Sequence, residues 1–152
     1  MPDPVTFTSA SARFGLPFLF AGQSQKEFSV NEAHALVDAL LHCAIEGERA
    51  APPTAPVDGE CWLIGSAASG AWTGKTGQLA CRQTGTWLYV PPREGLRVTD
   101  KSTGQVLCYR GGWQRPARPA VPTGGASVDS EARTAIAQLV TALIAGGILA
   151  ES

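Results

Sequence analysis

Residues 59–113 read GECWLIGSAASGAWTGKTGQLACRQTGTWLYVPPREGLRVTDKSTGQVLCYRGGW, and this stretch decides the fold. Short runs of β-branched and aromatic residues alternate with turns, and a large aromatic follows glycine at Gly70-Ala-Trp72, Gly85-Thr-Trp87 and Gly112-Trp113. This spacing is typical of a small β-meander. A meander can bury such rings as a core or present them as a binding surface, and it offers no obvious catalytic pocket.

Five strands are expected in this stretch, because each candidate run is bounded by glycine, proline or polar turn residues. Thr84-Gly85 has the form of a tight hairpin tip, and Asp100-Lys-Ser-Thr-Gly104 has the form of a longer one. The expected strands are Glu60–Ile64, Gln78–Gln83, Thr86–Val90, Leu96–Asp100 and Gln105–Arg110.

An amphipathic helix is expected before the strands. Ser29-Val-Asn-Glu32 has the pattern of a capping box, so the helix is predicted to begin at Ser29, and Gly47 is predicted to end it. Apolar side chains with helical spacing predict one stripe, by which the helix packs on the meander. They are Ala33, Leu36, Val37, Leu40, Leu41, Ala44 and Ile45.

Both ends of the chain carry apolar segments. Phe14-Gly-Leu-Pro-Phe-Leu-Phe20 contains Pro17, which excludes a helix interior, so we expect an extended segment docked on this domain or on a neighbouring subunit. A second helix is predicted from the N-cap Asp129 to Gly146-Gly147. Its stripe either folds back onto the domain or meets copies of itself. The stripe contains Ile136, Leu139, Val140, Leu143 and Ile144.

The sequence therefore predicts an α+β fold: a small antiparallel β-meander packed with one N-terminal amphipathic helix, an extended N-terminal arm and a linker-tethered C-terminal helix. The expected parts are an arm with its docked apolar segment (1–28), the helix plus meander (29–113), a Pro/Gly linker (114–128) and a C-terminal oligomerisation helix (129–152).

Composition narrows the function classes. The chain has 152 residues, enough for about one domain, and a formal net charge of −1 without a basic cluster, so no nucleic-acid partner is expected. No apolar run reaches membrane-spanning length, and Met1-Pro-Asp-Pro4 has no signal-peptide pattern. We therefore expect synthesis in the cytoplasm and no membrane insertion.

The cysteines are expected to be buried free thiols, because each stands among apolar residues. Two disulfides remain an alternative, and the absence of a Cys-x-x-Cys pair argues against a zinc site. The four positions are Cys43, Cys61, Cys81 and Cys108.

Candidate catalytic and metal-binding groups are sparse. His34, Asp38 and His42 have i, i+4 and i+8 spacing, which could place ligands on a metal, but a solvated polar helix face is the favoured interpretation. Four carboxylates could form a hydrolytic pair, yet each stands beside a turn, where such residues are commonly structural. They are Asp58, Glu60, Glu94 and Asp100. We expect no catalytic site, no metal and no cofactor.

The tryptophans allow a second functional hypothesis. Exposed rings at turns bind the flat faces of sugars or anchor protein interfaces. Trp62 is expected in the core, whereas core and surface are evenly balanced for Trp72 and Trp113. Trp87 is also expected in the core, because Trp87 and Tyr89 share one strand face. The alternative function is a carbohydrate-binding module that contacts a host glycan through Trp72, Trp87 and Trp113.

An ordered series of motifs covers about residues 12–113. It comprises Arg13-Phe-Gly-Leu-Pro-Phe18, Ala21-Gly-Gln-Ser-Gln-Lys26, Asn31-Glu-Ala33, Leu36, Asp38-Ala-Leu40, Pro56-Val-Asp-Gly59, Gly70-Ala-Trp72-Thr-Gly74, Gly77-Gln-Leu-Ala80, Thr86-Trp87 and Pro92-Arg-Glu-Gly95. Together these motifs resemble a domain of unassigned biochemical function found in tail-fibre and head-spike proteins of prophages and gene transfer agents.

The resemblance implies an oligomeric virion component that anchors a host-attachment fibre to a phage-like particle, as the base or adaptor of a head spike or tail fibre. Its partners would be capsid or tail proteins and a fibre subunit. A homotrimer is the default for fibres, and a particle vertex could impose five copies. We expect the oligomer interface to contain Phe14, Phe18, Phe20, Ile136, Leu139 and Leu143.

Overall fold

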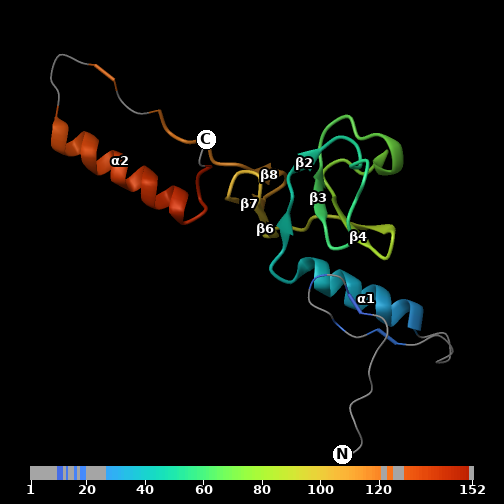
Figure 1. The fold of residues 1–152 in the computed structure, drawn as a ribbon. Coiled ribbons are helices and arrows are strands. Elements are labelled where there is room, and N and C mark those ends of the chain that lie inside the picture. Colours follow the sequence, from blue (N-terminus) through green and yellow to red (C-terminus); the bar gives the residue numbers. More distant parts are fainter. Residues whose placement is uncertain are drawn as a thin grey trace, which may run out of the picture. The chain divides into compact units, whose positions relative to one another are not determined.

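The computed structural model describes residues 10–11, 13, 16, 18–19, 27–120, 123–124 and 129–150. These residues contain two α-helices and eight strands in two sheets rich in antiparallel pairs, which confirms the predicted α+β fold with a C-terminal helix (Figure 1). The chain forms two compact units: residues 1–43 with 48–92 make unit 1, and residues 44–47 with 93–152 make unit 2. Both units thus take residues from the predicted 29–113 segment.

Unit 1 contains a four-stranded sheet in the order β2-β3-β4-β5. Its strands are β2 (Glu48–Arg49), β3 (Cys61–Ile64), β4 (Leu79–Gln83) and β5 (Thr86–Val90). The first pair is parallel and the other two are antiparallel. Thr84 and Gly85 join β4 to β5 with φ angles of 49° and 73°, so the predicted tight hairpin tip is confirmed.

The core of unit 1 forms around Trp72. This side chain is 0% exposed and ends a short 3-10 helix, Gly70–Trp72. It packs with Ile64 and Ala80, and the Trp87 ring meets it edge-on, with the ring centroids 5.2 Å apart. Trp72 is therefore a core residue.

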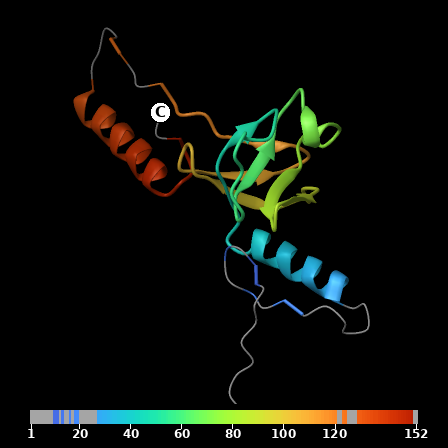
Figure 2. The same cartoon turned by 45° about the vertical axis from the view of Figure 1, so that its right-hand side comes forward.

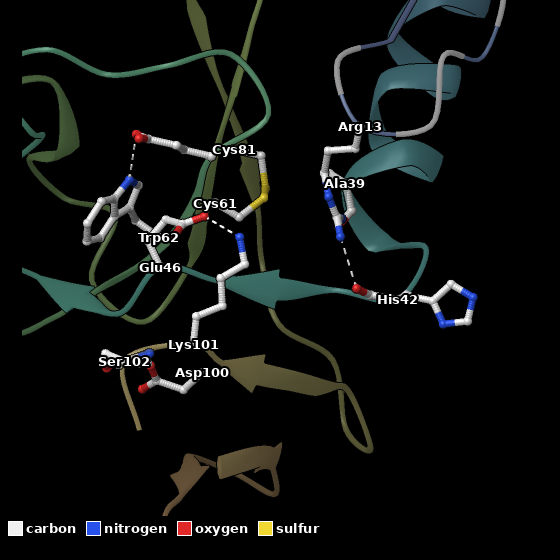
Figure 3. Close-up of polar contacts among 11 residues, drawn as sticks. Arg13, Ala39, His42, Glu46, Cys61, Trp62, Cys81, Asp100, Lys101 and Ser102 are labelled. Carbon is white, nitrogen blue, oxygen red and sulfur yellow. Dashed lines mark hydrogen bonds and ion pairs between the residues drawn. A yellow bond between two sulfur atoms is a disulfide. The ribbon is translucent and has the colours of Figure 1, made fainter. Parts of the chain in front are cut away.

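A disulfide joins adjacent strands of this sheet, which corrects the expectation of four free thiols. Cys61 and Cys81 are cross-strand neighbours in the β3–β4 ladder, with Cα atoms 4.1 Å apart, and their sulfurs are bonded (Figure 3). The strand register brings together two cysteines that lie 20 residues apart in the sequence. Cys43 and Cys108 are free, as expected, and only Cys43 is fully buried.

Removal of the disulfide is expected to lower stability. Replacing Cys61 and Cys81 together with alanine should reduce the free energy of unfolding by about 3 kcal/mol, because the bond closes a loop of 20 residues and restricts the unfolded chain. Urea unfolding with and without a reductant would measure the loss. The Cys108→Ser variant is the control, and a double variant as stable as the parent protein would contradict the prediction.

Helix α1 spans Glu27–Leu40, so it begins before the predicted Ser29 and ends well before Gly47. Its first turn therefore begins upstream of the predicted capping box. At the other end His42 has a φ of 49°, which turns the chain out of the helix. Ala44 and Ile45, predicted to be helical, instead form strand β1.

An arginine side chain holds the C-terminal end of α1. Arg13 Nη1 donates to the carbonyl oxygens of Asp38 and Ala39 at 3.0 and 2.8 Å. Arg13 Nη2 donates to the carbonyl oxygen of His42 at 3.0 Å (Figure 3). The Arg13 amide donates to Asp38 Oδ2 at 2.9 Å. These bonds satisfy carbonyl groups that a helix end leaves without intrahelical partners, and they explain why the helix stops there.

Unit 2 contains the second sheet, in the order β1-β6-β7-β8. The strands are β1 (Ala44–Ile45), β6 (Arg97–Asp100), β7 (Gln105–Tyr109) and β8 (Trp113–Gln114). Strand β1 runs parallel to β6, and the other pairs are antiparallel. Side chains alternate along β6 and β7, and the buried face carries Val98 and Leu107.

A polar network completes the core of unit 2. Asp100 is fully buried; its carboxylate accepts from Ser102 N at 3.0 Å, from Ser102 Oγ at 2.6 Å and from Arg115 Nη1 at 2.9 Å. Gln105 Nε2 donates to the carbonyl oxygens of Pro116 and Ile148 at 2.8 and 2.9 Å. The network thus ties the sheet to the linker and to the C-terminal tail.

Helix α2 spans Ser130–Ala145, and the predicted N-cap is confirmed because Asp129 Oδ1 accepts from Ala132 N at 2.8 Å. After the helix, the Gly147 carbonyl accepts from Val106 N at 2.6 Å. Leu149 is buried, and so is Val140 on the helix. The C-terminal end of α2, shown in red in Figure 2, is therefore attached to β7.

Candidate assembly surfaces

The inner face of α1 carries small residues. Ala35 and Ala39 are buried, and the void that they line with Cys61, Cys81 and other residues has a volume of only about 10 Å³. Such close approach of a helix to a disulfide requires short side chains. Asp38 is buried on the same face, where it binds the Arg13 amide.

The large apolar residues of α1 point the other way. Val37 is 52% exposed and Leu40 is 38% exposed, and Leu41 just after the helix is 42% exposed. The prediction that this stripe packs on the meander is therefore wrong, because the alanine face fits the disulfide more closely. Val30, Ala33, Val37 and Leu40 follow a 3-4-3 spacing and form the outer face of α1.

Helix α2 has a comparable surface. Ile136 is 44% exposed and Leu139 is 60% exposed, while Leu143 is half-buried. Together with Ala132 these residues follow a 4-3-4 spacing and form the outer face of α2. No charged side chain stands between Thr134 and Ala150. The fold buries Val140 and leaves the neighbouring stripe largely in water.

The described residues of the N-terminal arm contact their own chain. Phe18 is 7% exposed, and the side-chain amide of Asn31 binds the Leu19 backbone in both directions, accepting from N at 2.7 Å and donating to O at 3.0 Å. Phe18 is therefore buried without a neighbouring subunit, which corrects its assignment to the oligomer interface. The interface predictions for Phe14 and Phe20 lie outside the described residues.

A family model described as "Protein of unknown function (DUF2793)" matches residues 30–114, more than half of the chain. The chain belongs to the DUF2793 family. The matched segment runs from α1 through β8, and α2 follows it. No curated protein matches the chain.

The tryptophans of the DUF2793 segment do not form one platform. Trp72 has no exposed surface, so it cannot contact a glycan in this fold. The Arg82 guanidinium lies 5.1 Å from the centroid of the half-buried Trp87 ring, and Trp113 packs edge-on against Tyr109 at 5.4 Å. Trp87 belongs to unit 1 and Trp113 to unit 2. Glycan contact through these two rings stays a prediction.

The four carboxylates considered as hydrolytic groups all have structural partners. Asp58 Oδ1 accepts from Gly85 N at 3.0 Å, and Glu60 Oε2 accepts from Trp62 Nε1 at 3.2 Å. Glu94 Oε2 accepts from Gly111 N at 3.0 Å, and Asp100 lies in the buried network described above. These contacts agree with the interpretation that the four carboxylates beside turns are structural.

The histidine set does not form the expected helix face. His42 lies beyond the end of α1, and Asp38 is buried against Arg13 rather than solvated. Within the described ranges, no three side chains of His, Cys, Asp or Glu gather as metal ligands. No helix of that part of the chain is long and apolar enough to cross a bilayer.

Two side chains of the DUF2793 segment have shifted acidities. Burial raises the pKa of the Cys43 thiol, and the Arg13 guanidinium opposes part of the rise. Burial also raises the pKa of Tyr89, whose hydroxyl donates to the Ala71 carbonyl at 2.6 Å. Both groups stay protonated at neutral pH, so the Cys43 thiol is a poor nucleophile.

The outer face of α1 is the feature that sequence reasoning missed. Its residues were recognised as apolar, but their direction was assigned by hydrophobicity alone. The signal that could have corrected this is the second stripe of the same helix, Ala35 and Ala39 with Asp38 between them. A helix with apolar residues on two sides has two surfaces to cover.

Proposed function

We propose that this chain is a self-assembling structural subunit of a phage-like particle, where it forms the base or adaptor of a head spike or tail fibre and anchors a host-attachment fibre. The observation that carries the proposal is the outer face of α1, where Val37 and Leu40 remain in water while alanines face the sheet. Full burial of an exposed side chain of this size contributes about 1.5–3 kcal/mol, and covering the remaining exposed part of Val37 or Leu40 would contribute roughly half of that.

A second copy of the chain is the partner that fits this face. The 3-4-3 spacing on α1 and the 4-3-4 spacing on α2 are those of helices that pack in parallel or antiparallel bundles. A single seam of this length is marginal alone, so two seams in one subunit strengthen the case for a stable oligomer. We expect a trimer, and five copies at a particle vertex are the alternative.

The placement on a phage-like particle rests on the ordered motifs that resemble tail-fibre and head-spike proteins. Mass spectrometry of particles purified from cells that carry this sequence tests it directly. The chain should co-purify with capsid or tail proteins in a fixed ratio through a density gradient. Its recovery only in the particle-free fraction would contradict the placement while leaving self-assembly intact.

Lysine at both Val37 and Leu40 is expected to convert the oligomer into a monomer, because burying two unpaired charges costs more than the seam gains. The mass in solution, measured by light scattering across a dilution series, reports the change. The Val37→Ile/Leu40→Met variant keeps the face apolar and should retain the parent mass. A parent protein that is monomeric at every concentration would contradict the proposal.

Lysine at Ile136 and Leu139 tests the outer face of α2 in the same way. We expect a loss of mass or a weaker oligomer, because both side chains are exposed in the isolated chain and would be buried in the assembly. Gln138→Lys adds one positive charge at an exposed position away from this stripe and should leave the mass unchanged. Equal behaviour of the two variants would remove α2 from the interface.

A further inference from the structure

Unit 2 carries an open hollow on the solvent-facing side of its sheet. The hollow has a volume of about 540 Å³ and is lined by Val106, Cys108, Arg110, Gln114 and Pro116. An adjoining hollow of about 440 Å³ shares four of these residues and extends to Arg97. Both volumes fall within the range of about 300–1,000 Å³ that is usual for small-molecule sites.

The strand register explains how the polar groups converge. Arg97 on β6 is the cross-strand partner of Cys108 on β7, and Cys108 is the partner of Gln114 on β8. Cross-strand partners share a face, so these residues form one row across three strands. Arg110 follows two residues after Cys108, so it lies on the same face as a diagonal neighbour of Arg97.

The two arginines bring unbalanced positive charge to the hollow. Neither the Arg97 nor the Arg110 side chain makes an ion pair or a hydrogen bond with the rest of the described chain, whereas Arg115 in the same unit binds Asp100 at 2.9 Å. None of the residues that line the two hollows is acidic. An anion between the guanidinium groups would relieve their mutual repulsion.

We propose that this hollow binds a uronic acid, a sugar ring that carries a carboxylate. Guanidinium groups match the planar carboxylate and can hold it through paired hydrogen bonds. The Gln114 amide can both donate to and accept from ring hydroxyls, and Val106 and Pro116 offer apolar contact to a ring face. The hollow is open to water, which suits a polar ring better than an aromatic acid. The residues that line the hollow are not those of the outer helix faces, so the site does not depend on the assembly role.

A thiol in the hollow allows a direct binding test. Cys108 is free and half-buried there, Cys43 is free but buried, and the other two cysteines form the disulfide. D-glucuronate should slow alkylation of Cys108 by iodoacetamide about tenfold at roughly ten times its dissociation constant, by simple mass action. Glucose at the same concentration should not. Cys43 should remain unlabelled, which reports an intact fold.

Arginine variants assign the protection to this hollow. Arg97→Gln/Arg110→Gln should abolish protection by glucuronate, while Arg93→Gln, an exposed arginine outside the hollow, should keep it. The Val37→Lys/Leu40→Lys variant should be protected as the parent protein is, which separates binding from assembly. If the double arginine variant labels at Cys43, the single Arg110→Gln variant replaces it in the test.

Several results would overturn the proposal. Equal protection by glucose would show that the site does not recognise the carboxylate. Equal protection by N-acetylglutamate or inorganic phosphate would show that it does not recognise the sugar ring. Protection that persists in the Arg97→Gln/Arg110→Gln variant, or in Arg110→Gln where that variant replaces it, would place the ligand elsewhere. Protection by glucuronate alone, lost with the arginines, would support the site.

Discussion

Trp72→Ala should unfold unit 1 or leave it barely stable. The side chain is 0% exposed and contacts Ile64, Ala80 and Trp87, so its removal leaves a large cavity in a small core. Such truncations cost about 3–5 kcal/mol, a large part of the roughly 5–15 kcal/mol that stabilises an ordinary domain. Urea unfolding followed by near-ultraviolet circular dichroism measures the effect.

Trp72→Phe is the matched control. Phenylalanine fills most of the space, and it also removes Nε1–H, a buried donor for which the described part of the chain provides no hydrogen-bond acceptor. Loss of that unsatisfied group offsets part of the lost packing, so this variant should remain folded. Surface substitutions usually change the free energy of unfolding by less than about 0.5 kcal/mol. If Trp72→Ala changes it by no more than that, Trp72 is not the centre of the core.

Asp100→Ala should destabilise unit 2 by about 2–4 kcal/mol. The substitution removes a buried carboxylate that accepts from Ser102 and Arg115, and breaking such a pair leaves donors without an acceptor. The cost stays below that of a fully buried pair because Arg115 is 33% exposed and can reach water. Hydrogen-exchange measurements test this: backbone amides of β6 and β7 should exchange faster in the Asp100→Ala variant than in the parent protein.

An exposed ion pair in the same unit provides the comparison. Lys101 Nζ lies 2.6 Å from Glu46 Oε1, with the two side chains 54% and 29% exposed (Figure 3). Lys101→Ala should change stability by less than about 1 kcal/mol, because exposed pairs gain little over hydration. Equal losses in the Lys101 and Asp100 variants would contradict the importance assigned to the buried network.

The strands were predictable wherever alternation and turn residues agreed. Thr86–Val90 was predicted with its observed bounds, and the other four predicted strands differ from the structure by a single residue at one end. The two-residue strands β1, β2 and β8 were missed, because so short a segment has no periodicity and forms only when a longer neighbour pairs with it.

Neither the disulfide nor the face of α1 that packs on the sheet could be predicted from the sequence, and the reason is the same for both. Both depend on the β3–β4 register, which places Cys61 beside Cys81 and thereby creates a surface that only alanines can approach closely. The apolar stripe on α2 was predicted, and Ile136 and Leu139 are exposed on it. The sequence left open whether this helix folds back onto the domain, because its attachment depends on backbone contacts of Gly147 and Ile148 with β7.

Strand β1 limits how this protein can be divided into its two units. Residues 44–47 belong to unit 2 although they precede most of unit 1, and Ile45 within them is fully buried. No single cleavage point therefore releases both units whole. Recombination that exchanges one unit as a continuous segment would leave Ile45 without its buried surroundings, or would remove β1, the edge partner of β6. Natural variants should therefore differ at the turns between strands and not by exchange of whole units.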